Sequence, residues 1–413
     1  MFNQTKRSVG FVVIKFIRKN MKLKYSQIAL FLYSFALVVF SGITETTMIE
    51  NGIGAALVGI FIIESSITND FTLRWHKSIV FILLFVACAF ISLLISPEAI
   101  RRFITVVLVM ILFFIVYNIV AETKSMLPVA LGLIAGLFYT IILQFDQIML
   151  SLDGVSQERL SGLIGNANDY SYYLFATTLI LMLPLIGRYK ISPFIRYGIY
   201  ACILIFSVLL LTTTGSRKGI ILLAFIIIAT FILMSRGEVL LVKMQYMAVF
   251  GVFFLFLFSI FSESAFVDRI ENIFLYSQGQ EVNESSLETR DNMISTALTM
   301  WTTKPFTGWG IDSFRIHSGY GTYSHNNYTE VLFSMGIIGF VLYYGFFLSV
   351  LLWCVKLLKG YKNTINYKIV GWAVISIFVL LLWDFAAVSY YDKKYWLFMG
   401  VILAVLVNTE EER

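Results

Sequence analysis

Long apolar stretches recur along almost the whole chain and are separated by short polar segments. Each stretch is about 17–25 residues long, the length at which an α-helix crosses the hydrocarbon core of a bilayer. The stretches lack the alternation of apolar and polar residues that is typical of membrane β-barrels. Because backbone polar groups inside a bilayer must bond within the protein, the pattern predicts a bundle of transmembrane α-helices.

The pattern predicts about twelve spans, of which the second is short enough to be tilted or interfacial. Their ranges are 26–42, 52–66, 77–95, 103–120, 126–145, 170–186, 194–212, 218–234, 241–261, 329–355, 367–386 and 391–407. The predicted fold class is therefore an all-α polytopic integral membrane protein with one membrane domain over residues 26–407.

Composition agrees with this fold class. The chain is 59% hydrophobic and 14% charged, with a mean hydropathy of +0.83, whereas soluble proteins average about 45–50% apolar and about 25% charged residues. Cys88, Cys202 and Cys354 all fall inside apolar stretches, which favours reduced packing residues over a disulfide framework or a metal site. The net charge of +6 is no signal for nucleic acid, because cytoplasmic loops account for it.

Lysine and arginine are distributed unequally between the two sides of the predicted bundle. With the N-terminus inside, the inside segments hold 20 of the 31 lysines and arginines, and the outside segments hold 11. Cytoplasmic loops carry such an excess, so both termini are predicted to be cytoplasmic, with 408–413 as a short tail. Residues 1–25 are basic with interleaved apolar residues and suit anionic lipid, although a topology anchor alone is the simpler interpretation. No cleavage site follows the first apolar core, so that span is expected to remain as an anchor.

On this topology, residues 262–328 form one long extracytoplasmic loop between the ninth and tenth spans. Its stretch "SSLETRDNMISTALTMWTTKPF" predicts a helix with Ser286 as its N-cap and a stop at Pro305. The following "PFTGWGIDSF" is typical of a turn. Long loops with internal structure are usually lids or binding surfaces, and the helical pattern argues against a disordered spacer.

Three polar stretches fall on the outer side. The first is "QERLSGLIGNANDYSYY", residues 157–173, in which Arg159, Asn166, Asn168 and Asp169 precede or begin a helix that starts near Asp169. A helix N-terminus with a nearby arginine is a ready anion site. Asparagine and aspartate are also ordinary helix caps, and for this stretch alone the capped loop is the favoured interpretation.

The second stretch is "TTTGSRKGI", residues 212–220, which places Arg217 and Lys218 outside, against the positive-inside bias. Binding a diphosphate is one reason for such a pair, because arginine forms forked hydrogen bonds to phosphate oxygens. Pairing with an acidic residue of the long loop is an equally good reason.

The third stretch is "YGTYSHNNYTEVLFSMGIIGF", residues 320–340, where His325 stands just before a long apolar run. Histidine exchanges protons near neutral pH, so His325 is a candidate general base. The alternative is a helix cap built from Ser324, His325 and Asn326. His76 is predicted to lie in an inside loop, and His317 is a weaker candidate in the long loop.

Together the three stretches predict a cation-rich pocket with one titratable base outside the membrane. This combination suits transfer from a diphosphate-linked donor, in which a cation stabilises the leaving group and a base activates the attacking hydroxyl. The chain has no Walker motif, no HExxH motif and no glycine-rich nucleotide loop, so no metal or cofactor is expected.

These stretches resemble the O-antigen ligase and Wzy-type polysaccharide polymerase superfamily. Four segments carry the resemblance in order, from about residue 155 to about residue 345: "RLSGLIGNAND", "TTTGSRKGIILL", "ETRDNMISTALTMWTTKPFTGWGIDSF" and "SHNNYTEVLFSMGIIGFVLYY". The first half of the chain agrees only as a set of spans. Ala167 stands where the family often has proline, which changes the stiffness of the turn but removes no functional group.

The resemblance implies a metal-independent, GT-C-like membrane glycosyltransferase. It would polymerise or ligate undecaprenyl-diphosphate-linked repeat units at the outer face of the bacterial plasma membrane, in capsule, exopolysaccharide or O-antigen synthesis. By analogy His325 is the base, Arg217 with Arg159 and Arg290 holds the diphosphate, and Asn166 and Asn168 orient sugars. Lys218 and Asn326 belong to the same implied binding site. A chain-length regulator or a flippase is an implied partner.

Two other function classes remain open. The family includes proteins labelled as transporters, and twelve spans suit a flippase of lipid-linked sugars. A transporter is expected to carry polar residues near the membrane midplane. The nearest such residues, Glu64, Gln144, Asp146 and Asp384, all lie close to predicted span ends. A non-catalytic assembly partner is the third class, and it would not need the arginines and the histidine.

Overall fold

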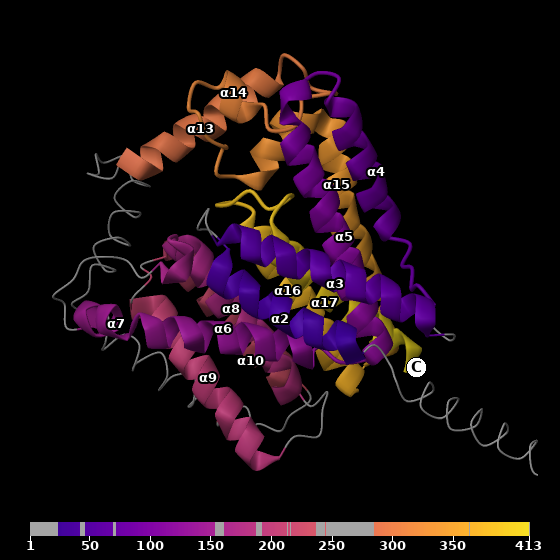
Figure 1. The fold of residues 1–413 in the computed structure, drawn as a ribbon, viewed down its shortest axis with the longest axis vertical. Coiled ribbons are helices and arrows are strands. Elements are labelled where there is room, and N and C mark those ends of the chain that lie inside the picture. Colours follow the sequence, from indigo (N-terminus) through magenta and orange to yellow (C-terminus); the bar gives the residue numbers. More distant parts are fainter. Residues whose placement is uncertain are drawn as a thin grey trace, which may run out of the picture.

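The computed structural model describes residues 24–41, 46–68, 72–152, 161–186, 192–212, 214, 216–236, 244, 285–362 and 364–412. Throughout these residues the chain forms helices joined by turns, with no strand (Figure 1). The longer helices are α2 Lys24–Phe40, α3 Thr47–Ile67, α4 Ile79–Ser92, α5 Ile100–Thr123, α6 Leu127–Leu143, α8 Ala167–Leu185, α9 Pro193–Thr212, α10 Arg217–Ser235, α13 Ser285–Trp301, α15 Asn327–Gly360, α16 Ile365–Trp383 and α17 Lys393–Glu411. The shorter ones are α7 Phe145–Leu152, α14 Phe314–His317 and the 3₁₀ turns η1 Pro97–Ala99 and η2 Gly162–Ile164.

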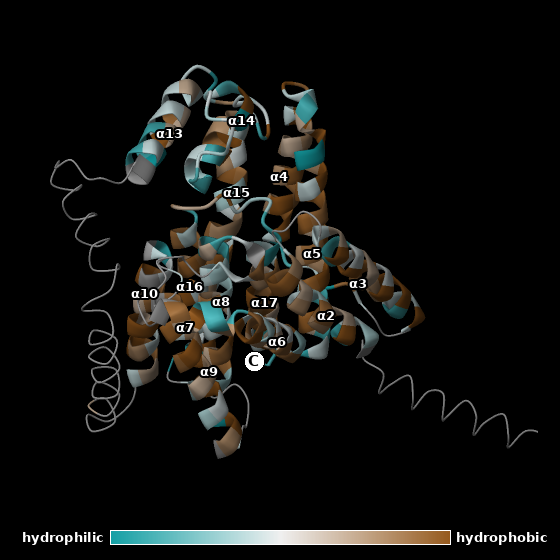
Figure 2. Cartoon of the chain, turned by 60° about the vertical axis from the view of Figure 1, so that its left-hand side comes forward, coloured by the Kyte–Doolittle hydropathy of each residue, from teal (hydrophilic) through white to brown (hydrophobic). Residues whose placement is uncertain are grey.

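The helices have the character of membrane spans. Four described segments, Thr47–Ile67, Pro97–Thr123, Asn327–Gly360 and Ile365–Trp383, are long and apolar enough to cross a bilayer. Five shorter apolar helices accompany them, and apolar residues dominate the bundle in Figure 2. Large apolar side chains also lie on the outside of the bundle. Soluble proteins rarely expose apolar patches of this extent, so the chain is a helical membrane protein.

The helices follow the predicted spans closely. Every predicted span coincides with a described helix except 241–261, which lies outside the described residues. Residues 1–23 and 262–284 also lie outside them. The number of crossings therefore stays a prediction. Helix α7 lies in a segment that was predicted to be loop.

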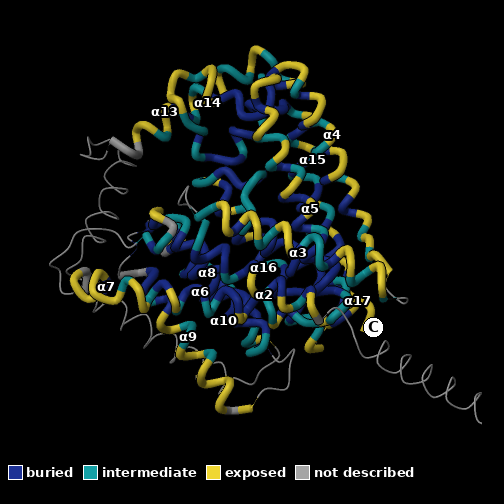
Figure 3. The backbone as a smooth tube through the Cα atoms, in the orientation of Figure 1, coloured by how far each residue is buried: buried dark blue, intermediate teal, exposed yellow. Residues whose placement is uncertain are grey.

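Two helices, α8 and α17, form the centre of the bundle. All residues of α8 from Tyr170 to Leu183 are buried, and so are all residues of α17 from Tyr395 to Leu406. A helix that is covered on every side belongs in the interior, and Figure 3 shows buried backbone gathered where α8 and its neighbours lie. The N-terminal ends of both helices lead to the candidate site.

The described part of the long loop contains the predicted helix. It is α13, which lies with α14 at the end of the molecule that α4, α5 and α15 also reach (Figure 1). The predicted bounds were slightly wrong, because Ser286 is the second residue of α13 and not its N-cap. The helix ends at Trp301, and turns lead on to Pro305.

Helix α15 is broken at Gly336, whose backbone has φ 62° and ψ −167°. A break of this kind leaves the carbonyls of the preceding turn without their helical partners. The Trp309 amide donates to the Phe333 carbonyl at 2.8 Å, and the Gly310 amide donates to the Ser334 carbonyl at 2.9 Å. The segment after α13 thus takes the place of the missing helical turn.

Glycine is required on both sides of this contact. A Cβ atom on Gly336 would lie 2.2 Å from the Phe306 carbonyl oxygen, and one on Gly308 would lie 2.5 Å from the Ser334 backbone. Both glycines also have positive φ angles, which side-chain-bearing residues adopt at a cost. Two of the sequence segments that resemble the O-antigen ligase superfamily therefore bind to each other.

Candidate functional site

Four helices begin close together, and a side chain caps each of them. A helix N-terminus presents unpaired amides and the positive end of the helix dipole, so a group of such ends favours an anion. The caps are Asn166 for α8, Ser216 for α10, Asn326 for α15 and Asp392 for α17. The contacts below show that these ends meet.

The starts of α8 and α10 lie side by side. The Ser216 hydroxyl donates to Asn168 Oδ1 at 3.2 Å, and the Ser171 hydroxyl donates to Ser216 Oγ at 3.0 Å. Gly219 allows this approach, because a Cβ atom there would lie 3.1 Å from the Ser171 side chain. Asn168 therefore links two of the predicted polar stretches.

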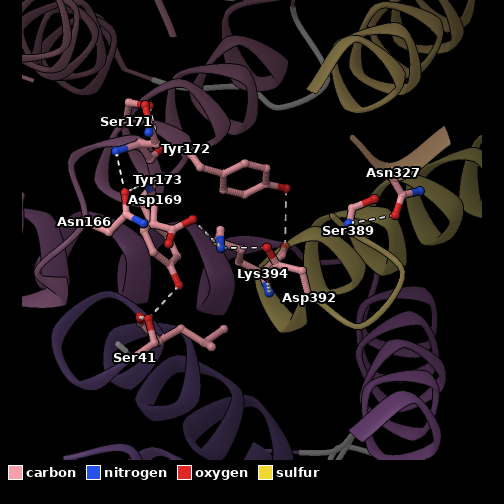
Figure 4. Close-up of polar contacts among 12 residues, drawn as sticks. Ser41, Asn166, Asp169, Ser171, Tyr172, Tyr173, Asn327, Ser389, Asp392 and Lys394 are labelled. Carbon is pink, nitrogen blue, oxygen red and sulfur yellow. Dashed lines mark hydrogen bonds and ion pairs between the residues drawn. The ribbon is translucent and has the colours of Figure 1, made fainter. Parts of the chain in front are cut away.

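An ion-pair cluster joins the start of α8 to the start of α17. Lys394 Nζ lies 3.0 Å from Asp169 Oδ1 and 2.6 Å from Asp392 Oδ2 (Figure 4). The Tyr172 hydroxyl donates to the Lys394 carbonyl at 3.5 Å on the same side. Lys394 and Asp392 were missed in the sequence, although two adjacent lysines at the start of the last predicted span offered a signal.

Lys218, in the first turn of α10, contacts the loop between α16 and α17. Its ammonium donates to the Ala386 carbonyl at 3.0 Å and lies 3.6 Å from the centre of the Trp383 ring. Within the described part of the chain, Lys218 forms no ion pair with a carboxylate. The described residues thus give no support to the alternative that it pairs with an acidic residue of the long loop.

The same loop holds the start of α15. The Asn327 amide donates to the Asp384 carbonyl at 2.8 Å, and Asn326 Nδ2 donates to the Phe385 carbonyl at 3.3 Å. Four helix starts and the α16–α17 loop, residues 384–392, therefore form one structural unit.

A buried clamp reinforces this unit. The Asp384 carboxylate accepts hydrogen bonds from Asn327 Nδ2 at 3.2 Å, from the Tyr344 hydroxyl at 3.1 Å and from the Ser389 hydroxyl. In return, Asn327 Oδ1 accepts the Ser389 amide at 2.9 Å (Figure 4). The sequence placed Asp384 only near the end of a span and gave no sign of this pairing, which joins residues 57 positions apart.

His325 lies immediately before α15 in a left-handed conformation, with φ 57°. The helix cap is Asn326, whose side chain accepts the Thr329 amide at 3.1 Å, so the alternative of a helix cap is confirmed at Asn326 and not at His325. The imidazole packs against the Tyr323 ring at 4.4 Å between centroids. Among the described residues it makes no hydrogen bond, which leaves both ring nitrogens available.

The surroundings of His325 keep its imidazole neutral. Burial lowers the pKa of His325 to about 4, and the positive charges of Arg290 and Lys218 add to this effect. Arg290 comes from α13 in the long loop, so α10, α13 and α15 together determine the charge of one side chain. At neutral pH the group can accept a proton.

The structure brings most of the predicted residues together. Lys218 and Arg290 act on His325, whereas Asn168 and Asn326 bond to the helix starts around it. The Asn166 side chain accepts the amides of Asn168 and Asp169, so the capped-loop interpretation is confirmed there.

Two predicted residues are not located by these contacts. Arg159 lies outside the described residues, and so does the side chain of Arg217, the first residue of α10. Cys88, Cys202 and Cys354 carry free thiols. No group of three or more histidine, cysteine, aspartate or glutamate side chains in the described ranges is arranged to hold a metal ion.

The sequence of this region was compared with the models of known protein families. Residues 202–344 match the model of the O-antigen ligase family. This segment is therefore similar to the O-antigen ligase domain of that family. It contains Lys218, Arg290, His325 and Asn326, and the resemblance seen in the sequence is confirmed. No curated protein matches the chain.

The O-antigen ligase domain runs from within α9 into α15. Segment 157–173 lies before it, and the α16–α17 loop lies after it. The candidate site is therefore completed by residues on both sides of the domain. The family indicates a glycan-transferring membrane protein that acts on a lipid-linked glycan.

Proposed function

We propose that the protein is a membrane glycosyltransferase that polymerises or ligates undecaprenyl-diphosphate-linked oligosaccharide units. The reaction takes place at the outer face of the bacterial plasma membrane. One observation carries the proposal: His325, which makes no hydrogen bond to any described residue, has its pKa lowered by burial and by the charges of Arg290 and Lys218, where four helices begin. This arrangement combines an anion site with a base.

The donor diphosphate binds at the helix starts. Helix dipoles and the amides that the caps leave unpaired favour its negative charge. Burial lowers the pKa of Lys218 to about 7, and the negative charge of the diphosphate favours the protonated form of this ammonium group. Arg290 adds a second cation from the long loop. Arg217, in the first turn of α10, and Arg159 complete the diphosphate site.

The chemistry is one displacement at the anomeric carbon of the donor sugar. The acceptor hydroxyl oxygen forms a bond to that carbon, and the bond from the carbon to the phosphate oxygen breaks. The bonding electrons leave with the diphosphate, whose charge the cations stabilise. His325 takes the proton of the acceptor hydroxyl.

Donor binding strengthens His325 as a base. The same cations that lower its pKa in the free protein are neutralised when the diphosphate binds. The pKa of His325 then rises in part, because burial, the larger cause of its lowered value of about 4, remains. His325 is therefore a stronger base when the donor is in place.

The asparagines shape the acceptor side. Asn168 and Asn326 bond to the helix starts and hold the walls of the site. Asn166 is exposed, its side-chain oxygen accepts backbone amides, and its Nδ2 donates to a sugar hydroxyl of the bound glycan. The long loop closes over both substrates, and the lysine and arginine bias puts both termini in the cytoplasm. A chain-length regulator or a flippase works beside it.

The test is a reconstituted assay with purified protein, a synthetic undecaprenyl-diphosphate oligosaccharide, chelator and no nucleotide. We expect a ladder of repeat-unit length, or glycan moved to an added acceptor, that is lost in His325→Asn and reduced but measurable in Lys218→Gln. Arg101→Gln, which changes an exposed arginine, is the matched control. Movement of the lipid-linked sugar across liposomes without any new glycosidic bond would instead establish a flippase.

A further inference from the structure

The long loop rests on the tip formed by α4 and α5, a part of the chain that no functional motif covers. The Ile311 amide donates to Ser92 Oγ at 3.2 Å. Gly310 lies so close that a Cβ atom there would be 2.5 Å from the Ser96 Cβ. The segment that fills the break of α15 therefore also packs against the end of the neighbouring helix α4.

Asp312 fixes this contact. Its carboxylate bonds to Arg102 Nε at 3.2 Å through one oxygen and to Arg315 Nη2 at 3.0 Å through the other. Asp312 is buried and has φ 59°, which a residue other than glycine adopts only at a cost. Strained backbone persists where surrounding contacts hold it, and it clusters at functional segments.

Arg102 also contacts a residue near the candidate site. Its guanidinium lies 3.8 Å from the centre of the Tyr391 ring, in the α16–α17 loop. Tyr391 and Tyr323 are electrostatic neighbours, and the Tyr323 ring packs on His325. Arg102 thus joins three segments that are far apart in the chain, and it stands two side chains away from the imidazole.

We propose that Arg102 is a positioning residue, a latch that holds the long loop and the α16–α17 loop together so that His325 is fixed relative to the helix starts. The latch itself stands on the contacts of Arg102, whereas its effect on catalysis rests on the proposed function. An arginine suits the role, because one planar group bonds a carboxylate and stacks on an aromatic ring. Loss of the latch leaves the reacting groups present but misplaced, which lowers the rate of the bound complex.

The variants are chosen to separate the latch from general damage. Arg102→Gln removes the charge and the stacking plane, whereas Arg102→Lys keeps the charge. Arg101→Gln is the matched control, because Arg101 is the exposed neighbour. Arg315→Gln removes the outer partner of Asp312 and leaves Arg102 in place.

The first measurement is hydrogen–deuterium exchange of the backbone amides of residues 308–317 in the full-length protein in lipid nanodiscs. We expect faster exchange in Arg102→Gln than in the wild type, an intermediate rate in Arg102→Lys and no change in Arg101→Gln. Equal amide exchange rates in Arg102→Gln and the wild type would reject the proposal that Arg102 holds the loop.

The second measurement is glycan transfer with the undecaprenyl-diphosphate oligosaccharide. We expect kcat of Arg102→Gln to fall on the order of tenfold while KM for the donor changes little, because the misplaced group acts after binding. Arg102→Lys should recover part of the rate. A loosened loop with an unchanged kcat would reject the positioning role. If the wild type transfers no glycan, the proposed function fails, and the exchange rates alone then accept or reject the latch.

Discussion

His325 combines a strained backbone, a neutral side chain and two cationic neighbours. Its backbone is left-handed and its imidazole packs against Tyr323, whereas Asn326 forms the capping bond of α15. Histidine and asparagine tolerate this conformation better than most residues with side chains. These features distinguish His325 from a residue that only caps the helix.

Replacing His325 by asparagine tests its chemistry without disturbing its backbone. Asparagine tolerates φ 57°, so we expect unchanged yield and thermal stability. Transfer should fall on the order of 10²–10⁴-fold, the usual contribution of a general base. The measurement is the initial rate of product formation. His317→Asn, an exposed histidine in the same loop, should keep full activity. An initial rate of His325→Asn within a few-fold of the wild-type rate would exclude His325 as the general base.

The acid limb of the pH–rate profile, which is the fall of kcat/KM at low pH, should depend on the charges around His325. Transfer needs the unprotonated imidazole, so kcat/KM should decline as pH falls toward the His325 pKa of about 4 in the free protein. Lys218→Gln removes one repelling charge, which raises that pKa and moves the limb to higher pH. The measurement is kcat/KM across the acid range for both proteins. A limb that stays in place or moves to lower pH would contradict this account.

At the scale of elements, the break in α15 and the segment after α13 depend on each other. The Ile337 amide donates to the Pro305 carbonyl at 2.8 Å, so the segment bonds to α15 on both sides of Gly336. The backbone groups of each segment find their hydrogen-bond partners only in the other segment. A straight α15 would use its own carbonyls within the helix and could not bind the segment after α13.

Gly336→Ala should therefore damage the protein more than a comparable change elsewhere. Positive φ alone costs about 1–2 kcal/mol for alanine. The added Cβ would also meet the Phe306 carbonyl oxygen at 2.2 Å. Gly319→Ala is the matched control, because Gly319 has φ 81° and open space around it. Thermal unfolding in detergent should show the larger loss for Gly336→Ala, and equal losses would mean that the loop does not dock there.

At the scale of the molecule, the α16–α17 loop holds the site together. Its backbone carbonyls accept hydrogen bonds from Lys218 of α10 and from Asn326, the cap of α15. The side chain of Asp384 in the same loop accepts a hydrogen bond from Asn327. The central helices α8 and α17 carry the ion-pair cluster on their first turns. A membrane bundle gains little from hydrophobic burial between helices, so such polar contacts give it specificity.

Asp384→Asn should weaken this assembly. The change keeps the shape but presents an amide to the donors of Ser389, Tyr344 and Asn327. Each donor left without a partner costs about 1–3 kcal/mol, so we expect a lower unfolding temperature together with lower transfer. Asp146→Asn, on the exposed face of α7, is the control and should change neither. Unchanged stability of Asp384→Asn would show that the clamp is dispensable.

The orientation is testable by labelling intact cells. In a protein with Cys88, Cys202 and Cys354 replaced by alanine, Thr303→Cys should react with a membrane-impermeant maleimide. A cysteine added after Arg413 should react only after the membrane is permeabilised. The expectation follows from the excess of lysine and arginine on the inside segments. The reverse pattern would invert the topology and place the site in the cytoplasm.

The sequence by itself determined the class of protein, the places of its described helices and the helix inside the long loop. These features follow from the length of apolar stretches, the positions of glycine and proline and the capping residues, which act over a few neighbouring residues. It also singled out Lys218, because a cation on the outer side departs from the positive-inside bias, and His325, because histidine titrates near neutral pH. The family resemblance implied Arg290.

Only the tertiary structure decided what these residues meet. Lys218 contacts Ala386 across 168 residues, and Arg102 contacts Asp312 across 210. Contacts over such separations depend on how whole helices pack, and no local pattern encodes them. The same packing forces Asp312 and His325 into left-handed backbone and breaks α15 at Gly336. The sequence supplied the charged and titratable groups, and helix packing brought them within reach of one another.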